Sequence, residues 1–257
     1  MFGRDARVAG ALAAIITAAT VTVISGGPAV AEPNPDAGPD NCDFITELID
    51  HNPHVAMKDA ARIIKTDCGY RYRAGQQNSH LVITQVGNSL RFSDRGTDRI
   101  DVLAKRCTEI KGVRGIAAKC PIPSSISESD RLLVEVWPRL GNDFVDGSSL
   151  SSKFSMTVLA DAGNDTALLG AGPDFFNGAF GNDRVRGGSG DDWIRTGDQR
   201  DRITAGAGDD YITGGYGPDR IDGGDGADRL YCGPGKDSAV RDGGDAKVYL
   251  CEAVRFA

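Results

Sequence analysis

The stretch GGYGPDRIDGGDGADRLY, residues 214–231, contains the same nine-residue frame twice in succession. The frame is GGxGxDxUx, where U is apolar, and it recurs with variations through residues 161–241. A period this short cannot enclose a core of its own, so neighbouring units must stack and share one. One aspartate stands at every ninth position: Asp165, Asp174, Asp183, Asp192, Asp201, Asp210, Asp219, Asp228 and Asp237.

A single apolar residue follows each of these aspartates by two positions. Stacked units would place these residues in one buried ladder, which predicts that each unit is a turn followed by a short strand. The nine residues are Ala167, Phe176, Val185, Ile194, Ile203, Ile212, Ile221, Leu230 and Ala239.

The turn GGxGxD has the chemistry of half a calcium site. Glycines permit positive φ and leave the backbone carbonyls uncovered, so the chain can curl around an ion. The aspartate adds a hard, charged oxygen. Calcium takes six to eight oxygens from carboxylates and carbonyls, so two facing turns would complete one site.

These nine in-phase units resemble the RTX, or haemolysin-type, calcium-binding nonapeptide repeat. The resemblance implies an all-β parallel β-roll (β-helix) solenoid in which two nonapeptides make one coil and calcium lies between turns of successive coils. Aspartates eighteen residues apart would then act together, with at most seven sites between coils. One edge would hold Asp165, Asp183, Asp201, Asp219 and Asp237, and the other Asp174, Asp192, Asp210 and Asp228.

The match to the frame is uneven. In the unit ending at Asp201, Thr196 replaces the leading glycine and Gln199 the turn glycine, so we expect a defective site there. The units 161–165 and 179–183 lack their second glycine, and we expect weaker binding. The best turns are expected at 187–192, 206–210, 214–219 and 223–228, with Gly187, Gly190, Gly206, Gly208, Gly214, Gly217, Gly223 and Gly226.

The charge distribution points to the same cation chemistry. Residues 161–245 contain seventeen Asp, no Glu and nine Lys or Arg, whereas the whole chain has a net charge of −7. A merely solvated acidic face would use Glu as well as Asp, while a tight turn needs the shorter side chain. Without cations these carboxylates would repel one another and oppose compaction.

The N-terminal residues predict export. Arg4 and Arg7 precede an apolar stretch from Val8 to Ile24, and AVA at 29–31 fits the small residues before a cleavage point. We therefore expect 1–31 to be a signal peptide and the protein to be secreted. A membrane anchor is the alternative, although the stretch is short for a span. No transmembrane segment is expected in the mature chain.

Six cysteines agree with an oxidising compartment, where they would form three disulfides. Fifteen pairings are possible, and proximity in sequence favours Cys42–Cys68, Cys107–Cys120 and Cys232–Cys251. A zinc site is disfavoured because no pair has CxxC spacing. The last pairing would staple the final turn to a closing strand, KVYL at 247–250, over Leu230 and Ala239. Residues 242–257 would then cap the roll.

Upstream of the repeats the pattern is less regular. Residues 32–78 are predicted to be a linker and a small helical element, with short helices between Asp43 and Lys65. Residues 79–160 change to strand-like runs such as HLVITQV and RLLVEVW, which predict an irregular β region of leading coils.

The residues that flank the buried ladder should point outward, and successive units should place them on opposite outer faces of the solenoid. One face would carry Arg184, Arg186, Arg202 and Arg220, and the other Phe175, Trp193, Tyr211 and Tyr231. The aromatic row could be a partner face for a cell-surface glycan or protein. The alternative is that these rings pack along the strands or under an N-terminal segment.

Catalytic motifs are missing from the sequence. It contains no HExxH, GxSxG or phosphate-binding GK[ST] loop, and its histidines are His51, His54 and His80. We therefore predict a secreted calcium-binding protein without enzymatic activity, ordered by extracellular calcium. The alternatives are a calcium-rigidified adhesion module and, less favoured, a hydrolase with its active site in 42–160. The acidic balance argues against nucleic acid as a partner.

Overall fold

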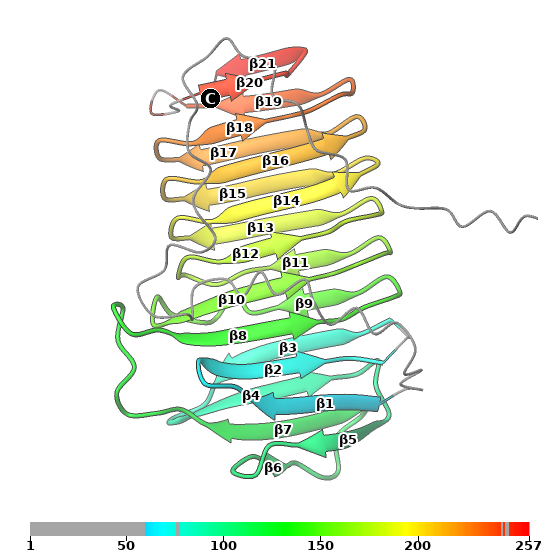
Figure 1. Ribbon diagram of the computed structural model, residues 1–257, viewed down its shortest axis with the longest axis vertical. Coiled ribbons are helices and arrows are strands. Elements are labelled where there is room, and N and C mark those ends of the chain that lie inside the picture. The colour runs from blue at the N-terminus through cyan, green and yellow to red at the C-terminus, as the bar shows by residue number, and fades with distance from the viewer. Residues whose placement is uncertain (1–59, 76–77, 243, 245–246, 257) are drawn as a thin grey trace, which may run out of the picture. The chain divides into compact units, whose positions relative to one another are not determined.

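A computed structural model describes residues 60–256 apart from 76–77, 243 and 245–246. Over this part of the chain every regular element is a β-strand (Figure 1). It has no helix long and apolar enough to span a membrane. The strands form two sheets, which we call sheet A and sheet B.

Sheet A has ten strands. In spatial order from the C-terminal end they are β20 (Lys247–Tyr249), β18 (Arg229–Tyr231), β16 (Tyr211–Tyr216), β14 (Trp193–Asp198), β12 (Phe175–Asn177), β10 (Phe154–Leu159), β8 (Leu132–Trp137), β2 (Gly69–Arg73), β1 (Ala60–Lys65) and β5 (Arg99–Leu103).

Sheet B has eleven strands. In the same direction they are β21 (Ala253–Phe256), β19 (Ser238–Arg241), β17 (Arg220–Asp225), β15 (Arg202–Ala207), β13 (Arg184–Ser189), β11 (Thr166–Leu168), β9 (Phe144–Asp146), β3 (His80–Gln85), β4 (Ser89–Asp94), β7 (Ile116–Pro121) and β6 (Thr108–Glu109).

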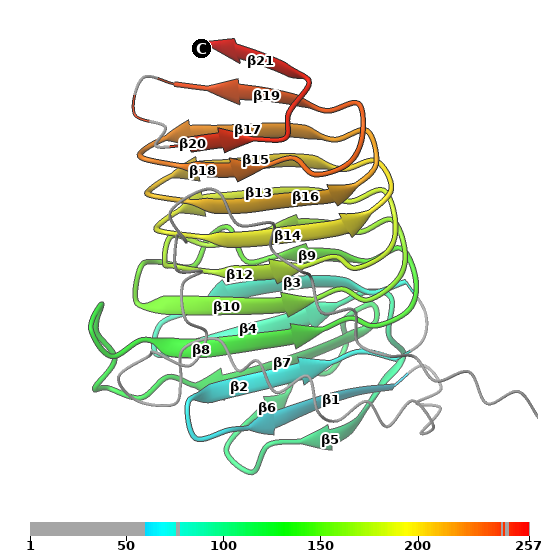
Figure 2. The same cartoon turned by 45° about the horizontal axis from the view of Figure 1, so that its top comes forward.

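The repeats form a parallel β-solenoid, as predicted. Each coil contributes one strand to each sheet, and equivalent strands of successive coils pair in parallel. Val185 lies opposite Ile203, and Ile203 lies opposite Ile221, so one coil contains eighteen residues, or two nonapeptides. Figure 2 shows these strands stacked one above another from β8 and β9 to β21.

The predicted apolar ladder forms the core of this stack. All nine of its residues, from Ala167 to Ala239, are at most 2% exposed. They continue without a break into the side chains of the first coils, including Val145 and Val158. Burial of this ladder is therefore shared between coils rather than completed within any one of them.

The N-terminal end of the stack differs from simple coils. Strands β2 and β3 pair in parallel with β8 and β9, but β1 pairs antiparallel with β2, and β4 pairs antiparallel with both β3 and β7. The large side chains Tyr72 and Phe92 are fully buried at this end and stack on each other. The antiparallel strands thus close the apolar end of the solenoid (Figure 1).

The predicted helical element is wrong where the structure tests it. Ala60–Lys65 is strand β1, in which Ile63 is buried and Lys65 is exposed. Pairing with β2 and β5 satisfies its backbone, and this tertiary context overrides the local helical pattern. Residues 43–59 of that prediction lie outside the described residues.

The C-terminal end is closed by two strands. The disulfide Cys232–Cys251 is present, and Val248 of β20 pairs over Leu230, as predicted. Ala239, however, lies opposite Val254 of β21 rather than under KVYL. The disulfide Cys107–Cys120 also forms, whereas Cys42–Cys68 involves a residue outside the described ones.

The substituted turns keep the backbone conformation of glycine turns. Asp161 and Ala179 stand where the frame has its second glycine, and their φ values are 75° and 65°. Gln199 stands at the fourth position, with a φ of 86°. This left-handed region is strained for residues that carry a Cβ, so stacking imposes the turn shape even where the sequence opposes it.

Ala179→Gly should therefore stabilise the protein by about 1 kcal/mol, because glycine removes the strain at positive φ. Ala207→Gly is the matched control, since Ala207 is exposed in strand β15 and has no left-handed φ. Chemical denaturation of both variants measures the difference. An Ala179→Gly protein no more stable than the Ala207→Gly protein would contradict the strain argument.

Candidate metal centre

The repeat aspartates form two ladders of hydrogen bonds between coils. In each ladder the Oδ1 atom of an aspartate accepts the backbone N–H of the aspartate eighteen residues earlier, at 2.8–2.9 Å. The structure thus brings together the aspartates that the repeat pairs, and it buries all nine of them. Each coil is tied to the next through the carboxylate.

One ladder runs beyond the nine repeat aspartates. The Asp143 N–H donates to Asp165 Oδ1 at 2.7 Å, and Asp143 itself accepts the Ser79 N–H. At the other end the Asp237 N–H donates to Glu252. Sequence reasoning did not place Asp143 among the sites, although the triplet GND at 141–143, repeated at 163–165 and 181–183, was the signal for it.

The second carboxylate oxygen is left without a donor along most of the ladders. Within the described residues, Oδ2 is buried and accepts no hydrogen bond in Asp143, Asp165, Asp183, Asp192, Asp201, Asp210, Asp219 and Asp237. A buried, unsatisfied carboxylate oxygen costs free energy unless a proton or a cation meets it. A row of such atoms therefore needs protons or cations along the ladder.

The leading glycine of the turn opens a space beside this oxygen. A Cβ on Gly187 would lie 2.2 Å from Asp192 Oδ2 and 2.5 Å from the carbonyl oxygen of Ala205 in the next coil. A Cβ on Gly214 would lie 2.8 Å from Asp219 Oδ2 and 2.7 Å from the Cys232 carbonyl oxygen. Two acceptor oxygens therefore border the same small space, which suits a hard cation.

The same cradle recurs beside Gly178, and at Gly223 a Cβ would lie 2.3 Å from Asp228 Oδ2. At Gly178 a Cβ would lie 2.0 Å from Asp183 Oδ2, although the missing second glycine suggested a weaker site there. The turn at 206–210, expected to be among the best, has the buried Ala205 at the leading position instead.

The other candidate glycines lie elsewhere in the turn. A Cβ on any of them would press on backbone atoms of the coil before it, at 1.9–2.6 Å, so they permit close stacking rather than border the carboxylate. These are Gly190, Gly206, Gly208, Gly217 and Gly226, all with positive φ.

Thr196 fills the cradle of the Asp201 turn. It replaces the leading glycine, is fully buried, and its Oγ1 donates to the Gly214 carbonyl oxygen at 2.9 Å. The hydroxyl thus satisfies an acceptor that faces open space in the glycine turns. This gives a structural reason for the defect that the sequence predicts at Asp201.

Asp174 also departs from the ladder. Its Oδ1 accepts the Met156 N–H at 2.6 Å and its Oδ2 accepts the Gly170 N–H at 2.7 Å. Two backbone amides already compensate this carboxylate, so it is poorly suited to bind a cation.

Burial raises the pKa of the ladder aspartates. The pKa of Asp183, Asp201 and Asp210 rises from 3.8 to about 7, mainly because desolvation penalises the charged form. The pKa of Asp192 rises to about 10, by burial first and then by the nearby carboxylates of Asp174 and Asp210. Without a cation, burial therefore makes these carboxyls bind protons more tightly than aspartates in water do.

No three side chains of His, Cys, Asp or Glu gather into a possible metal site within the described residues. Any ion bound at the cradles would therefore need backbone carbonyls as well as carboxylates. Calcium accepts such mixed oxygen sets, whereas zinc prefers sulfur and nitrogen ligands. The donor set fits calcium.

The two outer faces of the solenoid differ in exposure. Arg184, Arg202 and Arg220 form an exposed row on sheet B, with Arg186 in the adjacent row. On sheet A the aromatic side chains contact one another in turn, and Tyr249 extends the row: Phe175, Trp193, Tyr211, Tyr231 and Tyr249. Phe175 and Trp193 are only 8% exposed.

Comparison with known proteins agrees with the geometry of the turns. The family model for the RTX calcium-binding nonapeptide repeat matches residues 159–194, 186–217 and 204–239. No curated protein and no solved structure is similar enough to the chain to give a match. The matched segments cover the cradles described above, so residues 159–239 of this chain are RTX calcium-binding nonapeptide repeats.

Proposed function

We propose that this chain is a secreted calcium-binding protein whose β-roll is ordered by calcium outside the cell. The observation that carries the proposal is the row of buried Oδ2 atoms without a donor, three of which, in Asp183, Asp192 and Asp219, share a glycine cradle with a carbonyl oxygen of the next coil. Bound calcium would supply the positive charge that these oxygens lack.

The residues suited to hold the ions are Asp183, Asp192 and Asp219, with backbone carbonyls of the facing coil. Their Oδ1 atoms are already fixed by hydrogen bonds between coils, so Oδ2 is oriented before an ion arrives. Neutralising the ladders removes the cost of stacking like charges, and folding is therefore linked to binding.

An extracellular environment would support this calcium-linked folding. Extracellular calcium modules bind with dissociation constants of about 10⁻⁴ to 10⁻³ M, so they stay empty in the cytosol and fill outside. The disulfides Cys107–Cys120 and Cys232–Cys251 suit an oxidising compartment. The apolar N-terminal stretch predicted as a signal peptide agrees with both.

A calcium titration tests the proposal. The metal-stripped protein, with its disulfides intact, should gain far-ultraviolet β signal cooperatively as calcium is added, and calorimetry should show several ions bound. Magnesium at the same concentrations is the control, because it demands a smaller octahedral site. A protein with the same circular dichroism and the same denaturation midpoint in chelator and in calcium would overturn the proposal.

Thr196→Gly should create an additional calcium site. The change removes the hydroxyl that occupies the Asp201 cradle and frees the Gly214 carbonyl oxygen. Calorimetry should then show a higher calcium stoichiometry than in the parent protein. Thr204→Gly is the matched control, because Thr204 is an exposed strand residue away from any cradle. Equal stoichiometry in all three proteins would contradict the role given to Thr196.

The pH dependence of stability should reverse with calcium. Folding raises the pKa of the ladder aspartates from 3.8 to about 6–8 at most positions, as for Asp219 and Asp143. The folded, calcium-free protein therefore binds protons more tightly than the unfolded chain. The stability that the folded protein gains from this tighter proton binding is fully present below pH 4 and is lost as the pH rises through 6–8.

Denaturation midpoints at pH 5 and pH 8 check this prediction. In metal-free buffer the denaturation midpoint should be lower at pH 8 than at pH 5. In saturating calcium it should rise over the same interval, because protons no longer compete for the carboxylates. A calcium-free protein that gains stability toward pH 8 would show that the ladders are not protonated in the folded state.

A further inference from the structure

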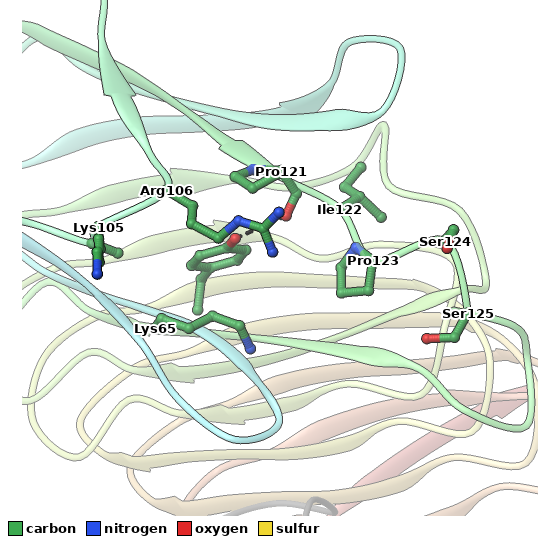
Figure 3. A pocket seen from close by; sticks show the side chains of 10 residues that line it. Lys65, Lys105, Arg106, Pro121, Ile122, Pro123, Ser124 and Ser125 are labelled. Carbon is green, nitrogen blue, oxygen red and sulfur yellow. Dashed lines mark hydrogen bonds between the residues drawn. The ribbon is translucent and has the colours of Figure 1, made fainter.

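A cavity of about 600 Å³ opens at the N-terminal end of the stack, among elements that the repeats do not use. Its walls come from the end of β1, the start of β2, the loop after β5 and the segment that follows β7. Figure 3 shows the side chains of Lys65 and Arg106 extending into the same space from opposite walls, with Pro123 beside it. The cavity has the size of sites that take small molecules, roughly 300–1,000 Å³.

Fixed contacts hold these walls in place. The disulfide Cys107–Cys120 joins the two segments that carry Arg106 and Pro121, the neighbours of its cysteines. The Tyr70 hydroxyl donates to the Pro121 carbonyl oxygen at 2.8 Å, which ties β2 to the same segment. The site is therefore preorganised by a covalent bond and a partly buried hydrogen bond.

The charge of the cavity is opposite to that of the protein. Lys65, Lys105 and Arg106 line it, and no carboxylate of the described residues does, although the chain has a net charge of −7. At the same end of the molecule Lys111 pairs with Glu109 and Arg99 with Asp101. None of the three lining cations forms an ion pair with a described carboxylate.

The cations surround an aromatic and apolar wall. The Lys65 ammonium lies 5.5 Å from the centroid of the buried Tyr70 ring. Burial raises the pKa of the Tyr70 hydroxyl, and the positive charge of Arg106 partly opposes this rise. Pro121, Ile122 and Pro123 continue the wall, and Ser124 and Ser125 add hydroxyls at its end.

We propose that this cavity binds a small ring compound that carries an oxyanion. The carboxylate or sulfate group would lie between Arg106 and Lys65, where charge-assisted hydrogen bonds are available from both. The ring would pack against Pro121, Ile122 and Pro123. Two sources share this chemistry, an acidic sugar and an aromatic acid, and this apolar wall suits the apolar face of either. The site is independent of the calcium switch.

The test is calorimetry on the calcium-saturated protein at low ionic strength. The probes are glucuronate and benzoate, their neutral counterparts glucose and benzyl alcohol, and sodium sulfate alone. At least one acidic ring should bind saturably and more tightly than both its neutral counterpart and sulfate, and added salt should weaken it. The probe that binds identifies the source of the oxyanion.

Two variants locate the binding. Arg106→Gln and Lys65→Gln should each weaken the acidic ring by about tenfold or more, the effect of losing a hydrogen bond to a charged group. Lys119→Gln is the matched control, because Lys119 is an exposed cation on the neighbouring strand β7 that does not line the cavity. Circular dichroism confirms that each variant is folded.

Three results would overturn the proposal. The first is that no acidic ring binds, and the second is that a neutral ring or sulfate alone binds as tightly. The third is that the two cavity variants bind no more weakly than Lys119→Gln. Because the experiment is run on folded protein in saturating calcium, each of these results leaves the calcium proposal unaffected.

Discussion

The structure depends on one arrangement, a carboxylate that uses one oxygen to join two coils and leaves the other facing inward. The first oxygen accepts a backbone N–H from the preceding coil, which sets the eighteen-residue register along the whole stack. The second has no donor in most turns and carries the electrostatic cost of burial. The same side chain is thus both the link between coils and the reason that a cation is needed.

The apolar ladder and the carboxylate ladders make different contributions. Ile194, Ile203 and Ile212 are at most 2% exposed, and the stabilisation from their burial is non-directional. The turns decide whether the backbone can bend tightly enough to bring those residues together. Since each coil contacts only its neighbours, a defect such as Thr196 acts locally and leaves the register beyond it unchanged.

The repeats were predictable from sequence because their constraint is local and periodic. A nine-residue spacing of aspartate and an apolar residue two positions later fix turn, strand and register together. Strand β1 was missed because its pairing with β2 and β5 depends on residues up to about forty positions away, which no local pattern displays. Asp143 was missed as a ladder member because it stands 22 residues before Asp165, outside the nine-residue period. The cavity at Arg106 depends on a disulfide and a hydrogen bond between distant segments, so composition alone gives no sign of it.

The closed ends have a consequence for the finite size of the molecule. A parallel stack with identical side chains in register has the pairing pattern of an amyloid fibre, which adds strands without limit. Here the outermost strands of sheet B are short, with two residues in β6 and four in β21, and they offer little backbone to a further strand. Each described disulfide lies next to one of these ends, so the covalent cross-links fix the chain where the stacking of coils stops.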